Sequence, residues 1–153
     1  MIISFCGHSD YLSNLEDEER LLKLFEKVIE NRQVDFYLGG YGAFDNFALK
    51  CAKKYKKKYP TARLVFVTPY LGKWLNDRKE FLTKTYDEIV YPNLERTPPK
   101  FAISKRNKWM IKQSDFVFGY VSTHYGGAYN SLLFAKRHKK SYINLYQGDY
   151  DLY

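Results

Sequence analysis

The chain has 153 residues, of which 45% are hydrophobic, and this is enough apolar material for a single packed domain over residues 1–153. Lys and Arg outnumber Asp and Glu by 25 to 17, which gives a formal net charge of +8 and favours anionic partners. No apolar run approaches the roughly 20 residues of a membrane-spanning helix, and the two cysteines lack the spacing of a metal site. We therefore expect a cytoplasmic protein with no membrane partner, no bound metal and no cofactor.

In the first 60 residues, two strands alternate with two helices. The apolar run 2–6 predicts a buried strand, and Ser13 then opens a capping-box pattern ahead of a predicted helix over 15–31. A second apolar run predicts a strand over 34–38, and helical spacing resumes over 45–59. The chain thus begins with two strand–helix units.

The remaining 93 residues continue the alternation, with one weaker stretch between residues 70 and 100. That stretch predicts short helices and a brief strand, with prolines marking its loops. The strands predicted in this part are 63–68, 88–91, 116–121 and 141–145, and the predicted helices are 104–113 and 127–139. The sequence predicts an α/β fold, a three-layer Rossmann-like domain with a mainly parallel sheet and helices on both faces.

Several small or polar residues stand at or just past the predicted strand ends. They are Gly7, Gly39, Thr68 and the loop 122–126. In parallel sheets, ligands bind beyond the carboxyl ends of the strands, at the point where the strand order reverses. We therefore expect these segments to meet at one edge of the sheet and to surround a ligand there.

A pair of glycines opens a predicted helix at two places, Gly39-Gly40 and Gly126-Gly127. Glycine lets the backbone take a positive φ and lets a ligand approach closely, and a helix N-terminus supplies N–H groups suited to an anion. At the first turn we expect the N–H groups of residues 42–44 to face this anion. Each turn is also compatible with an ordinary tight turn, but together they predict one nucleotide-like ligand held from two sides.

Five further side chains are candidates for specific roles. Arg106 could hold a phosphate or carboxylate in its planar fork, or form a surface salt bridge, and Asn107 could contact a base edge or tie down a loop. Asp45 is interpreted first as a helix N-cap and alternatively as an acceptor from sugar hydroxyls. His8 could act as an acid, a base or a donor, and Tyr41 could stack on a base.

A series of motifs carries a family resemblance. In chain order they are Phe5-Cys6-Gly7-His8, Gly39-Gly40-Tyr41-Gly42, Arg106-Asn107-Lys108-Trp109-Met110, Ser114-Asp115-Phe116-Val117, and Gly126-Gly127 followed by Phe134-Ala135. The series resembles the SLOG superfamily, named for DNA-processing protein A (Smf) and the Lonely Guy phosphoribohydrolases, and most of all its small YpsA-like bacterial proteins of unassigned function. This resemblance spans nearly the whole chain and implies a Rossmann-like fold that binds a nucleotide or a nucleotide-derived ligand.

Two departures from the family pattern bear on enzymatic activity. Lonely Guy enzymes use a glutamate soon after the second glycine motif to cleave an N-glycosidic bond, whereas residues 126–131 here contain no acid. Arg106 matches the arginine that would pair with that glutamate. Close relatives begin Gly-His-Arg, whereas Ser9 follows His8 here, which removes one cationic phosphate contact. These departures favour ligand binding over hydrolysis and leave enzymatic activity open.

Three functions follow as hypotheses. The first is binding or sensing of a nucleotide-derived small molecule through the two glycine-turn anion sites. The second is hydrolysis of a nucleotide N-glycosidic bond, of the phosphoribohydrolase or deoxyribosyltransferase type, in which Asp45 or Glu16 replaces the absent glutamate and His8 is a further catalytic candidate. The expected ligand-binding residues are Gly7, His8, Ser9, Gly39, Gly40, Tyr41, Gly42, Asp45, Thr68, Arg106, Asn107, Gly126, Gly127, Asn130 and Ser131.

The third hypothesis is binding of single-stranded nucleic acid. Two lysine-rich runs, 53–58 and 136–140, hold much of the positive charge, and the chain has 15 tyrosines that could stack on bases. We interpret the runs first as solvated ends of helices, where cations complement the helix dipole. A homo-oligomer is left open.

Overall fold

The structure is a computed structural model that describes all residues 1–153. The strands are β1 (Ile2–Gly7), β2 (Asp35–Leu38), β3 (Arg63–Val67), β4 (Glu88–Val90), β5 (Phe116–Tyr120) and β6 (Ser141–Asn144). The helices are α1 (Leu15–Ile29), α2 (Ala43–Lys58), α3 (Lys73–Thr85), α4 (Ala102–Gln113) and α5 (Gly126–Arg137), with a short 3₁₀ helix, η1 (Pro99–Phe101). The predicted elements are confirmed within a few residues, and the weakly patterned stretch forms one helix, α3, instead of several short ones.

All neighbouring strands pair in parallel, in the order β4-β3-β2-β1-β5-β6. The chain runs outward from β1 to β4 and then returns to the other side of β1, where β5 pairs with it. The strand order therefore reverses between β1 and β5, whose last paired residues are Gly7 and Tyr120. The predicted Rossmann-like α/β fold is confirmed, with a sheet that is entirely parallel.

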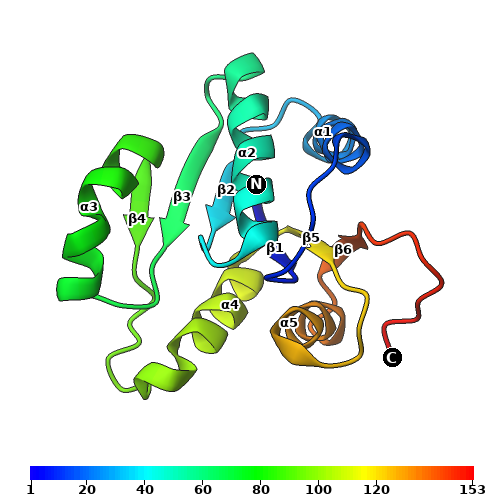
Figure 1. Cartoon of the computed structure of the whole chain (residues 1–153). Coiled ribbons are helices and arrows are strands. Elements are labelled where there is room, and N and C mark those ends of the chain that lie inside the picture. Colours follow the sequence, from blue (N-terminus) through cyan, green and yellow to red (C-terminus); the bar gives the residue numbers. More distant parts are fainter.

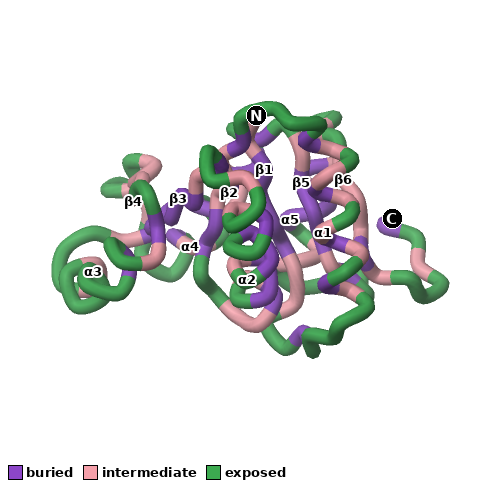
Figure 2. Tube along the Cα trace, turned by 90° about the horizontal axis from the view of Figure 1, so that it is seen from above, coloured by how far each residue is buried: buried purple, intermediate pink, exposed green.

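Helices cover both faces of the sheet, which gives the three layers visible in Figure 1. Alternate residues of a strand point to opposite faces. Phe5 packs with Phe25 of α1 and Phe36 of β2 in the larger core, under α1 and α2. Cys6, the next residue, belongs to the smaller core under α4 and α5, together with Leu132. Figure 2 shows this buried interior between exposed outer faces.

The start of α1 differs by one residue from the expected cap. The N-cap is Asn14 and not Ser13. The Oδ1 of Asn14 accepts a hydrogen bond from the Asp17 N–H at 2.8 Å. Asparagine and serine cap helices about equally well, so the helix register decides between them. None of the helices combines the length and the apolar character needed to cross a lipid bilayer.

Candidate functional site

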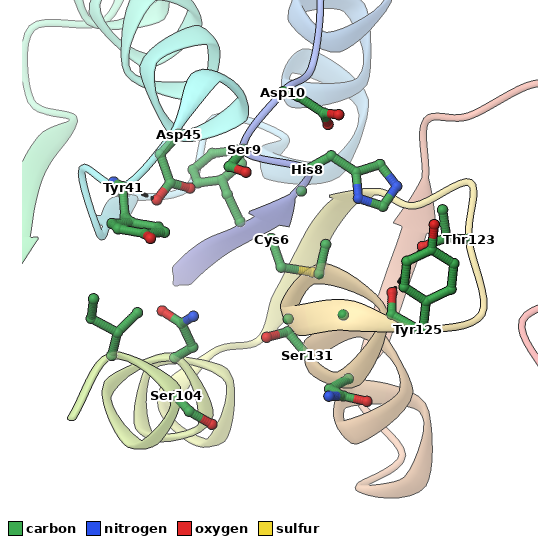
Figure 3. A pocket seen from close by; sticks show the side chains of 18 of the residues that line it. Cys6, His8, Ser9, Asp10, Tyr41, Asp45, Ser104, Thr123, Tyr125 and Ser131 are labelled. Atoms are coloured by element: carbon green, nitrogen blue, oxygen red, sulfur yellow. Dashed lines mark hydrogen bonds between the residues drawn. The ribbon is translucent and has the colours of Figure 1, made fainter. Parts of the chain in front are cut away.

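A cavity of about 510 Å³ opens beyond the carboxyl ends of β1 and β5, where the strand order reverses. Its walls come from the loop after β1, the start of α2, one side of α4, and the loop that leads into α5 (Figure 3). The candidates that line it are Gly7, His8, Ser9, Tyr41, Asp45, Asn107, Gly126, Gly127, Asn130 and Ser131. The candidates outside it are Gly39, Gly40, Gly42, Thr68 and Arg106. The expected meeting of segments at this edge is confirmed for the ends of β1 and β5.

The second glycine turn leaves its N–H groups free. Gly126 has a φ of 90° and begins α5, and the N–H groups of Gly127 and Ala128 follow it at the first turn of the helix. None of these three N–H groups donates to an acceptor in the protein. A Cβ added to either glycine would meet nothing within 4 Å. The positive end of the α5 dipole is therefore exposed to the cavity and suited to an anion.

The first glycine turn does not offer the expected anion cradle, because two of its three N–H groups are already used. The Ala43 N–H donates to the Ser9 carbonyl at 3.0 Å, and the Phe44 N–H donates to the His8 carbonyl at 3.4 Å. Gly42 has a φ of 88°, and a Cβ there would lie 2.8 Å from the Cα of Ser9. The turn thus fastens the start of α2 to the loop after β1, and glycine is needed for this close approach.

Asp45 is the third residue of α2 and not its N-cap, which is Gly42. Its Oδ2 reaches back to accept the Tyr41 N–H at 2.8 Å. Desolvation raises the pKa of Asp45 to about 6, while this hydrogen bond and the positive charge of Arg106 act in the opposite direction. The cavity therefore contains a partly buried carboxyl group that changes protonation state at mildly acidic pH.

Arg106 is buried, with 1% of its surface exposed, and contrary to expectation it neither lines the cavity nor forms a surface salt bridge. Its Nη1 donates to the carbonyls of Gly39 at 3.0 Å and Val67 at 2.8 Å. Its Nε donates to the Oδ1 of Asn107 at 2.9 Å, and this bond orients Asn107, which does line the cavity. Arg106 ties α4 to the ends of β2 and β3, because the carbonyls there need donors when they are buried.

Thr68 and Gly40 also have structural roles outside the cavity. Thr68 is fully buried, and its Oγ1 donates to the Tyr70 carbonyl at 2.6 Å. At Gly40, an added Cβ would lie 2.9 Å from the ring of Phe66. Both residues shape the ends of β2 and β3, on the side of β1 away from the cavity. Thr68 was selected for its proximity to a strand end, which applies equally to every strand, and Gly40 for its place in the first glycine pair.

His8 lies at the centre of the cavity wall and bonds to the loop before α5. Its Nε2 accepts the Ser122 N–H at 2.9 Å. A backbone N–H can only donate, so Nε2 is unprotonated and the proton of the neutral ring is assigned to Nδ1. Nδ1 has no partner in the protein and can donate to a ligand. Glu16, the alternative acid, does not line the cavity.

Lys108 is the cavity cation that the sequence hypotheses missed. It lies on α4 one residue after Asn107 and lines the cavity with Ser104. Positions 107 and 108 lie three and four residues after Ser104 and so share its face of the helix, and the available signal was that Lys108 stands in the same motif, 106–110, as Asn107. Its Nζ also lies 5.8 Å from the ring centre of Phe134 on α5. Tyr125, 75% exposed, and Tyr41, 59% exposed, are the tyrosines that line the cavity.

The two lysine-rich runs differ in their surroundings. In the run 53–58, acids pair with Lys54, Lys56 and Lys58, at 2.6, 2.6 and 2.8 Å respectively. The run 136–140 forms no ion pair, and α4 and α5 contain no Asp or Glu at all. The uncompensated positive charge therefore gathers on α4 and α5, the helices beside the cavity.

No family model matches the chain. The chain is 26% identical to the uncharacterized SPbeta prophage-derived protein YoqJ of Bacillus subtilis (strain 168), in an alignment that covers 80% of this chain and 82% of that protein. Among solved structures, DNA processing protein A from Helicobacter pylori, described for its single-stranded DNA binding mode, superposes with a TM-score of 0.62 at 16% identity. DNA processing protein A from Streptococcus pneumoniae superposes with a TM-score of 0.65 at 12% identity.

The superpositions cover 93% and 98% of this chain but only 63% and 52% of the two DNA processing protein A chains. At these identities the likeness shows a shared fold. The chain corresponds to about half to two thirds of those proteins.

Proposed function

We propose that this chain is a SLOG-type protein of the YpsA-like kind, and that its cavity binds a phosphorylated, nucleotide-derived small molecule. The observation that carries the proposal is the set of free N–H groups at residues 126–128, which face one cavity together with Lys108. The fold shared with DNA processing protein A supports the superfamily assignment. Cytoplasmic location and homo-oligomerisation stay predictions.

The charges around the cavity orient the ligand. The phosphate binds at the N-terminus of α5, where the helix dipole and Lys108 both favour negative charge. Asp10 and Asp45 line the cavity as acids, so the ligand presents hydroxyl or amino groups to them and keeps its anionic group away. Tyr41 or Tyr125 stacks on the planar base at the cavity mouth. The anion therefore occupies one glycine turn and not both.

Titration calorimetry with adenosine monophosphate and adenosine tests this function directly. The monophosphate is expected to bind at least about tenfold more tightly than adenosine, because charge-assisted bonds to the phosphate contribute roughly 1.5–3 kcal/mol. Nucleotide sugars and cyclic nucleotides extend the same comparison. If no phosphorylated nucleotide in this panel releases or absorbs heat, the proposal fails.

The second candidate function is hydrolysis of an N-glycosidic bond, and the carboxyl group of Asp45 favours it. A general acid or base works best with a pKa near the working pH, and the pKa of Asp45 is raised to about 6 in the cavity. The reaction is cleavage of the N-glycosidic bond of a nucleoside monophosphate by water, releasing the base and a sugar phosphate. Release of free base, abolished by Asp45→Asn, supports this candidate; absence of base release with the wild-type protein contradicts it.

The positive charge on α4 and α5 favours single-stranded nucleic acid as another partner. These helices carry no acid, and Lys108 belongs to both the cavity and this basic surface. Binding through phosphates weakens steeply with salt, because counterions are released on association. A gel shift with a single-stranded oligonucleotide at low salt, lost as salt rises, supports this partner. Absence of a shift at low salt excludes it.

A further inference from the structure

The last residues of the chain fold back onto the loop that leads into α5 (Figure 1). The Tyr150 hydroxyl donates to the Thr123 carbonyl at 2.6 Å. The Nε2 of His124 bonds to the Asp151 carbonyl at 2.5 Å, and its ring stacks on Tyr150 with 4.7 Å between the ring centres. Two consecutive loop residues are thus held by two consecutive residues near the C-terminus.

This C-terminal segment, residues 146–153, is itself anchored to the body of the protein. Leu152 is only 7% exposed and belongs to the smaller core with Leu132 and Leu133 of α5. The Nζ of Lys136, also on α5, lies 3.5 Å from the ring centre of Tyr153. The segment therefore packs against α5 and links the loop to this helix.

The inner side of the same loop forms the cavity wall. Ser122, Thr123 and Tyr125 line the cavity, and Gly126 begins α5 directly afterwards. Before the loop, the N–H and carbonyl of Val121 both bond to the side chain of Asn144, at 3.0 and 2.9 Å. These two bonds fix the end of β5. The position of the loop 122–125 beyond this end depends on the loop's own contacts.

Those contacts are few. On the cavity side, the Ser122 N–H donates to His8, and within the loop the Thr123 hydroxyl donates to the Tyr125 carbonyl. On the outer side, Tyr150 and Asp151 supply the remaining hydrogen bonds. The loop residues Ser122, His124 and Tyr125 are exposed, so burial adds little to hold them.

We propose that residues 146–153 act as a strap that positions the loop 122–125 and, through it, the free N–H groups at the start of α5. Tyr150 and Leu152 are the positioning residues. A ligand that fixes the start of α5 must then also stabilise the strap, because coupling between two sites is reciprocal. The structural half of this proposal holds for any ligand, and the part that concerns affinity rests on the proposed nucleotide binding.

Amide hydrogen exchange of the free protein tests the structural half. Tyr150→Phe removes the bond to Thr123 and keeps the ring, so the Ser122 amide, which is the hydrogen-bonded amide of the loop, should exchange about five- to tenfold faster. The matched control is Tyr146→Phe, in the same segment, whose hydroxyl bonds to nothing and whose ring contacts Tyr150. Exchange in β1 should not change in either variant. Loop exchange in Tyr150→Phe within twofold of wild type overturns the proposal.

Leu152→Ala is a second test, because it detaches the strap from the core of α5. It should speed exchange both of the Tyr146 amide in the strap and of the Ser122 amide in the loop, while the central strands stay protected. Faster exchange in the strap alone overturns the proposal, since the loop would then keep its position without the strap. If this variant does not fold, the Tyr150→Phe result decides, because that change leaves the packing of the ring intact.

Calorimetry with adenosine monophosphate tests the functional half. Tyr150→Phe should weaken binding at least about threefold relative to both wild type and Tyr146→Phe, because the loop must first be ordered. Faster loop exchange with unchanged affinity overturns the link between strap and site. If the wild type binds no monophosphate, the proposed function fails, and the exchange experiment still decides whether the strap holds the loop.

Discussion

The guanidinium of Arg106 lies directly against the backbone of Gly39. The Nη1 of Arg106 donates to the Gly39 carbonyl at 3.0 Å, and a Cβ at Gly39 would lie 2.9 Å from the Cζ of Arg106. The motifs around Gly39 and Arg106 resemble ligand-binding signatures in the sequence. In the structure they form one buried contact between α4 and the end of β2.

Replacement of Arg106 should therefore reduce stability. Arg106→Met leaves the buried carbonyls of Gly39 and Val67 without their donor, and the free energy of unfolding should fall by about 2–4 kcal/mol. Urea unfolding followed by circular dichroism measures this. Arg137→Met, at the exposed end of α5, is the control and should cost less than about 0.5 kcal/mol. An unchanged stability with lost nucleotide affinity would return Arg106 to the role of anion anchor.

Gly42→Ala should destabilise more than Gly72→Ala. Both glycines combine a positive φ (88° and 69°) with an extended ψ (177° and −140°), a region that essentially only glycine adopts, so each substitution carries a backbone strain of about 1–3 kcal/mol. Only at Gly42 does the new Cβ also meet another part of the chain, the Cα of Ser9 at 2.8 Å, whereas Gly72 has nothing within 4 Å. The extra loss at Gly42 should be about 1–3 kcal/mol in thermal or urea unfolding. Equal losses would mean that the contact with Ser9 is not tight.

The effect of Asp45→Asn on stability should depend on pH. The pKa of Asp45 is raised from 3.8 to about 6 in the folded protein, so the folded state binds this proton more tightly than the unfolded state does. Ionised Asp45 therefore destabilises the fold above pH 6, and the effect disappears as pH falls below 3.8. Asp45→Asn should stabilise the protein relative to wild type near pH 7.5.

The stabilisation by Asp45→Asn should shrink steadily between about pH 6 and pH 4, because wild-type Asp45 becomes neutral in that range. Unfolding in urea at several pH values measures the difference between the two proteins. Asn46→Ala, at the neighbouring position, carries no titrating group and should give a difference that does not change with pH. A constant difference for Asp45→Asn would show that its carboxyl is not desolvated.

Lys108→Gln should weaken the binding of adenosine monophosphate about three- to tenfold and leave adenosine binding unchanged, because the lysine acts on the phosphate. Lys105→Gln, an exposed lysine on the same helix outside the cavity, should change neither. Calorimetry on the three proteins compares them. Equal effects of the two substitutions would indicate a general charge effect and not a contact in the cavity.

Oligonucleotide binding should depend on the lysines of the run 136–140, at and just past the end of α5, and not on those of α2. Neutralising Lys136 and Lys139 together should lower the slope of log K against log salt by about 1–2, since each phosphate contact contributes roughly 0.7 for single strands. Neutralising Lys53 and Lys57, which are exposed and form no ion pair, should leave the slope unchanged. Filter binding across a salt series measures both. An equal decrease in both double variants would place the strand elsewhere.

The sequence predicted the elements of this fold because their signals are local. Apolar runs such as 34–38 and helical spacing such as 45–59 depend only on near neighbours in the chain, and α/β alternation restricts them to a parallel sheet. The same rule predicted a site at the carboxyl edge of the sheet, formed by the ends of four strands, and the cavity lies at that edge, beyond the ends of β1 and β5. The weak stretch between 70 and 100 was resolved less well because α3 buries only Leu82, so its apolar pattern is faint.

The roles within the site depend on contacts between distant parts of the chain. Residues 42–44 and residues 126–128 look equivalent as sequences, but the carbonyls of His8 and Ser9 accept hydrogen bonds from the first turn, whereas no carbonyl accepts one from the second. Likewise, Arg106 is used inside the protein because the carbonyls at the ends of β2 and β3 lie beside α4 and accept its hydrogen bonds.

The amino-acid pattern alone thus determined which segments form strands and helices, that the sheet is parallel, and at which of its edges a ligand could bind. Only the tertiary structure decided which N–H groups stay free, which cation faces the cavity, and what holds the loop before α5. The physical reason is that a hydrogen-bond donor serves either the protein or a ligand. Which of these it serves is decided by acceptors that the fold brings near from far along the chain.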